Sequence, residues 1–149
     1  MKLDKENIKQ TASDVLNAKI KVLSDELDAI SEALSDTTKS TAGDKHETSR
    51  AHAQIEQERV SNQLSQLNRM RDMLSAIKTI PFQEIQAGSL VQLKTGFFYI
   101  SVPLGELHFN SEKIFCLSPS SPLAQQMLNK SKGDSIQLNG NEFVIENAI

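Results

Sequence analysis

The sequence predicts an α+β protein: a long antiparallel pair of helices, followed by a small antiparallel β domain with one short helix. Three observations indicate this fold class. Apolar residues recur every three or four positions through much of residues 1–80. Of the 6 glycines and 4 prolines, that segment holds only Gly43. All the aromatic residues, 6 Phe and 1 Tyr, follow Pro81. This shift in composition predicts two regions, residues 1–80 and residues 81–149.

The first region contains two apolar stripes with the spacing of coiled-coil a and d positions. The first stripe consists of Leu16, Ile20, Leu23, Leu27, Ile30 and Leu34, and the second of Val60, Leu64, Leu67, Leu74 and Ile77, with Arg71 at one seam position. We expect the stripes to bury each other in an antiparallel helical hairpin with its tip near residues 37–48. Arms of roughly 30 residues at ~1.5 Å per residue would be about 45 Å long. The alternative is one globule in which both helices fold against the second region, and the narrow stripes disfavour it.

The second region carries short runs that are typical of β-strands. Four of them precede the expected helix, at residues 89–94, 97–102, 105–109 and 113–117. A short helix is expected from Pro122 to about Asn129, because Ser121 can act as its N-cap and proline fits the first helical position. The dipeptide Asn139-Gly140 predicts a tight hairpin between two final strands. Together these elements indicate a small α+β domain.

Charge and composition exclude several classes of protein. With 16 basic and 19 acidic residues and a net charge of −3, the chain lacks the cationic excess of a broad nucleic-acid-binding face. The single cysteine, Cys116, cannot form an internal disulfide, and its apolar surroundings indicate core packing. No apolar stretch approaches the ~20 residues of a membrane span, and the charged start lacks the apolar segment of a signal peptide. We therefore expect a cytoplasmic monomer that does not bind a membrane.

The segment SPSSPLAQQMLNKSKGDSIQL (118–138) resembles the C-terminal signature of the bacterial Gre transcript-cleavage factors, the GreA and GreB type of elongation factor. The ending GNEFVIENAI is similar to the closing strand of that family. Gly43, Asp44 and Glu47 match the family's glycine-aspartate pair with a glutamate three residues after the aspartate. The resemblance implies that residues 1–80 form an antiparallel coiled coil. It also implies that residues 81–149 form a polymerase-binding domain with an FK506-binding-protein-like (FKBP-like) fold.

The resemblance further implies a function and a partner. Gre factors bind RNA polymerase at its secondary channel and extend the coiled coil toward the active site. Their tip carboxylates, here Asp44 and Glu47, would help hold a Mg²⁺ shared with the polymerase and so assist cleavage of backtracked RNA. The chain would contact nascent RNA only indirectly and would have no catalytic site of its own. The other site residues that the resemblance implies are the tip contacts His46 and Arg50 and the polymerase-binding residues Ser120, Pro122 and Leu123.

The residues after Glu47 depart from the family pattern, in which asparagine, alanine, an acid and an aromatic residue usually follow. This chain has Thr48, Ser49, Arg50 and Ala51 instead. Arg50 could clamp an RNA phosphate or a polymerase carboxylate. An alternative function is therefore a Gre-like regulator that occupies the channel and inhibits or modulates the polymerase without cleavage.

Other interpretations of these residues stay open. Asp44 and Glu47 also match a capping box at the start of the second helix. His46 and His52 could suggest zinc, but residues six apart point to different helix faces. The first helix carries an acidic run that is either a solvated face or faces a basic channel wall. It consists of Asp25, Glu26, Asp28, Glu32 and Asp36, and its charge would be offset by Arg59, Arg69 and Arg71.

Two further function classes remain as competitors. An FKBP-like fold would allow peptidyl-prolyl isomerase activity, although such a site needs an aromatic-lined apolar pocket and the core requires many of the few aromatic residues. The other competing class is a coiled-coil adaptor that never approaches an active site.

Overall fold

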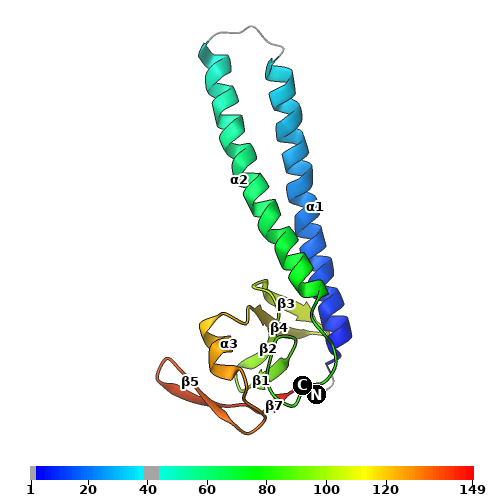
Figure 1. Ribbon diagram of the computed structural model, residues 1–149, viewed down its shortest axis with the longest axis vertical. Coiled ribbons are helices and arrows are strands. Elements are labelled where there is room, and N and C mark those ends of the chain that lie inside the picture. Colours follow the sequence, from blue (N-terminus) through cyan, green and yellow to red (C-terminus); the bar gives the residue numbers. More distant parts are fainter. Residues whose placement is uncertain (1–2, 39–43) are drawn as a thin grey trace. The chain divides into compact units, whose positions relative to one another are not determined.

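A computed structural model describes residues 3–38 and 44–149, and the side chains of residues 37, 38 and 44–46 lie outside the description. The chain divides into two compact units. Unit 1 comprises Met1–Asp14 together with Met70–Ile149, and unit 2 comprises Val15–Arg69. Figure 1 follows the helices and strands of both units along the chain. None of the helices in the described part of the chain has the length and apolar character that a membrane span needs.

Two long helices form the N-terminal half. Helix α1 spans Lys5–Thr38 (34 residues) and helix α2 spans Asp44–Ser75 (32 residues). Asp4 caps the start of α1: its carboxylate accepts a hydrogen bond from the Glu6 N–H at 3.0 Å, and its carbonyl accepts one from the Ile8 N–H at 2.9 Å. These bonds satisfy amides that have no partner within the helix.

Within unit 2 the two helices run antiparallel and side by side (Figure 1). Arg59 of α2 pairs with Glu26 of α1 at 3.4 Å, and the Gln57 amide donates a hydrogen bond to the Ser31 hydroxyl at 3.3 Å. Leu16 and Val60 are fully buried. The other predicted seam residues of unit 2 are half-buried: Ile20, Leu23, Leu27, Ile30, Leu34, Leu64 and Leu67. The predicted antiparallel hairpin is confirmed.

The strands all belong to unit 1 and form two sheets. The five-stranded sheet has the order β3-β4-β2-β1-β7, and strands β5 and β6 form a separate ribbon. Their bounds are β1 Leu90–Leu93, β2 Gly96–Ile100, β3 Gly105–Phe109, β4 Glu112–Leu117, β5 Ser135–Leu138, β6 Asn141–Val144 and β7 Asn147–Ala148. The predicted tight turn is confirmed, since Asn139 (φ 51°) and Gly140 (φ 80°) join β5 to β6.

One strand pair departs from the predicted antiparallel pattern. Strands β2 and β4 are parallel, with Tyr99 opposite Cys116, whereas the other pairs are antiparallel. Strand β3 lies at the edge of the sheet, so β4 returns between β3 and β2 in the same direction as β2. The sheet is therefore dominated by antiparallel pairs, and the prediction was wrong for this pair.

Both faces of the five-stranded sheet bury apolar side chains. Helix α3 (Pro122–Met127) contributes Ala124 and Met127 to the core on one face, which also contains Ile85, Val91, Leu93, Ile100, Leu117, Ile136 and Ile145. Alternation along the strands places a second buried set on the opposite face: Leu90, Tyr99, Leu107, Ile114 and Cys116.

Lysines of α1 hold the segment that follows α2. The Lys9 ammonium donates to the carbonyls of Ser75 at 3.1 Å and Ile77 at 2.7 Å, and so satisfies groups left unpaired at the end of α2. The buried Lys5 ammonium donates to the carbonyls of Ile80 at 2.7 Å and Gly88 at 3.1 Å. All these residues belong to unit 1.

Candidate functional site

The predicted metal-binding residues fall in the first turns of α2. The helix begins at Asp44, and Glu47 and Arg50 follow at successive intervals of three residues, so each position neighbours the one before it on the helix surface. The Glu47 side chain is exposed and that of Arg50 is half-exposed. The side chains of Asp44 and His46 lie outside the described residues, as do residues 39–43 of the predicted tip. A helix N-terminus carries partial positive charge and favours acidic residues at such positions.

The chemistry of this donor set suits Mg²⁺ only as a shared ion. Magnesium takes hard oxygen ligands in near-octahedral geometry, and two carboxylates supply only part of that shell. Across the described residues, no group of three or more His, Cys, Asp or Glu side chains could hold a metal. His52, weighed above as a zinc ligand, is exposed on α2. A magnesium ion at Asp44 and Glu47 would therefore need further ligands from another molecule.

The acidic run of α1 is mostly a solvated face. Four of its residues are exposed: Asp25, Asp28, Glu32 and Asp36. Arg59 offsets the fifth, Glu26, across the hairpin, and it also hydrogen-bonds Glu56 of its own helix, which lowers the pKa of Glu56. The other two arginines interact along α2 instead, Arg69 with Ser65 at 3.2 Å and Arg71 with Asp72 at 3.8 Å.

The predicted polymerase-binding residues lie at the start of α3. Ser121 is the N-cap, and its hydroxyl accepts a hydrogen bond from the Ala124 N–H at 3.2 Å, as predicted. Ser120 and Pro122 are exposed, and Ser120 Oγ lies 2.8 Å from Ser118 Oγ. Leu123 is half-buried and packs against the sheet core, so much of its surface is already covered. Ser120 and Pro122 are therefore the more accessible residues of this set.

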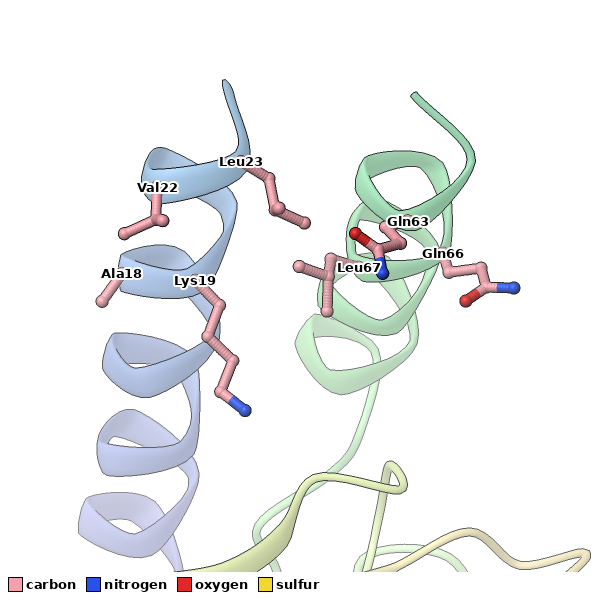
Figure 2. A pocket seen from close by; sticks show the side chains of 7 residues that line it. All are labelled: Ala18, Lys19, Val22, Leu23, Gln63, Gln66 and Leu67. Carbon is pink, nitrogen blue, oxygen red and sulfur yellow. The ribbon is translucent and has the colours of Figure 1, made fainter. Parts of the chain in front are cut away.

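A cavity of about 580 Å³ lies between the two helices of unit 2. Its lining consists of Ala18, Lys19, Val22, Leu23, Gln63, Gln66 and Leu67. Figure 2 shows Leu23 and Leu67 pointing toward one another across the seam. Val22 is 65% exposed. The heptad pattern identified the two leucines but not the cavity, because Ala18 and Val22 lie outside the predicted stripe.

Cys116 is buried, as its apolar surroundings predicted. Burial raises the pKa of its thiol to about 11, which disfavours the reactive thiolate. Burial also raises the pKa of Tyr99, its neighbour across the β2–β4 pair. These groups pack the core, and the arrangement gives no support to a nucleophilic role for Cys116.

A cavity on the sheet bears on the isomerase hypothesis. It has a volume of about 180 Å³ and is lined by Thr95, Gly96, Phe97, Phe98, Glu106, Lys113, Ile114 and Phe115. Sites for small ligands usually measure ~300–1,000 Å³. Although three phenylalanines line it, so small a space with an exposed Glu106–Lys113 pair gives that hypothesis no support.

Comparison with known proteins gives no match to a family model or to a curated protein. Two solved structures are similar. One is described as the transcription factor Gfh1, with 18% identity, 93% of each chain covered and a TM-score of 0.38. The other is described as GreA factor homolog 1 (Gfh1) of Thermus thermophilus, with 18% identity, 93% of this chain and 95% of that chain covered, and a TM-score of 0.39. At this identity and these TM-scores, neither likeness carries an argument about function.

Proposed function

We propose that this chain is a transcription elongation regulator of the Gre type that binds RNA polymerase. The observation that carries the proposal is the order of its parts: two long paired helices, then a β domain in which a Ser-Pro motif starts the short helix. This is the order that the sequence resemblance implies. At ~1.5 Å per residue, the 34 residues of α1 measure about 50 Å. A pair of helices of that length suits a narrow channel.

In this proposal unit 1 supplies the contact with the polymerase. Ser120 and Pro122 are exposed at the start of α3, and Leu123 stiffens the segment by packing on the core. Binding by these residues near the rim of the secondary channel would leave the helical pair of unit 2 free to enter it. The chain needs no second copy for this role.

The start of α2 supplies the proposed chemistry. Asp44 and Glu47 would act as oxygen ligands to a Mg²⁺ that the polymerase also holds. When bound there, the ion would stabilise charge on the attacking and leaving oxygens of the RNA phosphodiester. Glu47 is exposed on α2, so its carboxylate is accessible to such a partner. The chain would thus complete a site of the polymerase and contribute no catalytic group of its own.

A second candidate function rests on Arg50. Arg50 lies one turn after Glu47, neighbours it on the helix surface and is half-exposed. A cation there could pair with a polymerase carboxylate or an RNA phosphate. The chain would then occupy the channel and slow the polymerase without promoting cleavage.

Cleavage of RNA in a stalled, backtracked complex of the organism's own polymerase separates these functions. We expect the wild-type chain to accelerate cleavage and Asp44→Asn to reduce the acceleration by about tenfold or more. Glu58→Gln is the matched control, because Glu58 is an exposed acid on the same helix outside the predicted site. If the chain slows elongation without cleavage and Arg50→Ala relieves the inhibition, the second candidate holds.

Polymerase binding is tested separately from cleavage. We expect Pro122→Glu to weaken co-purification with the polymerase while the helical circular dichroism stays unchanged. Unchanged co-purification would contradict the proposed contact. A prolyl-peptide isomerisation assay tests the isomerase hypothesis directly.

A further inference from the structure

The apolar seam of the hairpin differs between its two helices. On α1 the heptad stripe continues through Ile30 and Leu34. On α2 the apolar stripe stops at Val60, and the next seam positions toward Asp44 carry other residue types: Gln57, Ala53 and Arg50. Arg50 and Ala53 are half-exposed while their immediate neighbours on α2 are exposed, and Gln57 is half-exposed and bonds to Ser31 of α1, so these three positions face α1.

The contacts between the helices fix which residues oppose each other. Gln57 bonds to Ser31, the neighbour of Ile30. Continuing the antiparallel register by one turn places Leu34 opposite Ala53. In this part of the hairpin, Ile30 and Leu34 of α1 therefore face the side-chain amide of Gln57 and the methyl group of Ala53 on α2.

The seam has a proximal part, residues 15–29 and 60–69, and a distal part, residues 30–36 and 47–57, and the two parts differ in the interactions that join the helices. In the proximal part, Leu16 and Val60 are fully buried, and the other seam positions are leucines of both helices and Ile20 of α1. In the distal part, the Gln57 amide donates a hydrogen bond to the exposed Ser31 hydroxyl at 3.3 Å. Exposed polar pairs of this kind contribute little to stability. Ile55 does not compensate, because it is 66% exposed and points away from the seam.

We infer that the hairpin is a two-part device whose distal part opens locally while the proximal part stays paired. Opening breaks the contacts of Ile30 and Leu34 with α2 and frees the first turns of α2, including Glu47. The inference concerns the free chain and goes beyond the proposed function. Under that function, opening would let Glu47 adjust to ligands on another molecule.

Hydrogen exchange of the full-length chain, followed by mass spectrometry at neutral pH, tests this inference. We expect amides of residues 47–57 to be protected about tenfold less than those of residues 60–69, because local opening exposes only the former. The double variant Ala53→Leu, Gln57→Leu restores an apolar stripe on α2. We expect it to slow exchange in the distal part by about tenfold and to leave residues 60–69 unchanged.

Gln54→Leu is the matched control, since it makes the same change at an exposed position of the same helix. It should leave exchange in both parts unchanged. Equal protection of the two parts in the wild-type chain would overturn the inference, and so would an equal effect of Gln54→Leu and Gln57→Leu as single variants. None of these outcomes depends on whether the chain binds a polymerase.

Discussion

In unit 1 most apolar side chains on both faces of the five-stranded sheet are buried, whereas in unit 2 most seam side chains stay half-exposed. Tyr99, Ile100 and Ile114 are 0% exposed, and so are Leu16 and Val60, the fully buried apolar residues of the described part of unit 2. A sheet residue is covered by its neighbours and by a second layer, but a residue between two helices is covered from one side only. The length of the helices therefore adds few buried side chains to the core. Under the proposed function, that length serves instead to present the first turns of α2 to the polymerase.

The polar contacts differ between the units in the same way. In unit 1 the buried Lys5 ammonium bonds two carbonyls and lies 4.4 Å from the centroid of the Phe82 ring. In unit 2 the ion pair of Arg59 with Glu26 is exposed and weakened by solvent. We expect substitutions in unit 1 to affect stability more than substitutions of the same kind in unit 2.

The largest effect is expected from truncating the core. Ile100→Ala removes a fully buried side chain and should lower the free energy of unfolding by about 2–5 kcal/mol. Leu23→Ala removes a half-buried side chain beside a cavity and should cost about 1 kcal/mol. Urea unfolding followed by Tyr99 fluorescence and by helical circular dichroism measures both. Equal losses for the two variants would contradict the contrast between the units.

A second effect is expected at Gly88, where backbone strain and a steric contact combine. This residue has φ +97°, and an added Cβ would lie 2.8 Å from the Lys78 carbonyl oxygen. Gly133 has nearly the same φ, +95°, with nothing within 4 Å of an added Cβ, and so provides the matched control. Gly133→Ala should cost about 1–3 kcal/mol from backbone strain alone. Gly88→Ala should cost more, and equal thermal stabilities for the two variants would show that the steric contact contributes nothing.

The smallest effect concerns the dependence of stability on pH. Burial lowers the pKa of Lys5 from 10.5 to about 8. Between these values the unfolded chain keeps a proton that the folded chain has released, so this group makes stability rise with pH above about 8. Lys5→Met should abolish that rise. The carbonyls of Ile80 and Gly88 and the Phe82 ring stabilise the ammonium, which keeps the effect small.

The measurement is the difference in unfolding free energy between wild type and Lys5→Met from pH 7.5 to 9.5. It should change in favour of the wild type as the pH rises. The pKa of Cys116, raised to about 11 by burial, makes stability fall above pH 9 in both proteins and cancels in the difference. A difference that stays constant over this range would show that Lys5 keeps its proton in the folded chain.

The parts of the fold that follow from local chemistry were predictable. The heptad spacing identified the seam residues, Asn139-Gly140 gave the tight turn, and Ser121-Pro122 gave the start of α3. Each of these depends on residues close together in the sequence. The candidate site was predictable only through the family resemblance, because two carboxylates three residues apart also match a capping box.

Contacts between residues far apart in the sequence were not predictable. No local pattern shows that the Lys5 ammonium reaches carbonyls of Ile80 and Gly88, since carbonyls occur at every residue. The parallel pairing of β2 with β4 depends on where β3 is placed, which periodicity within a strand does not determine. An apolar heptad pattern does not mark the seam positions of α2 nearest Asp44, because they carry Gln57, Ala53 and Arg50.

The most direct test of the central claim is the Mg²⁺ dependence of RNA cleavage in a backtracked complex saturated with the chain. If Asp44 and Glu47 are ligands to a shared ion, the wild-type chain should lower the Mg²⁺ concentration for half-maximal cleavage, and Asp44→Asn should return it to the value for polymerase alone. The same half-maximal concentration with wild type, with Asp44→Asn and without the chain would contradict the claim.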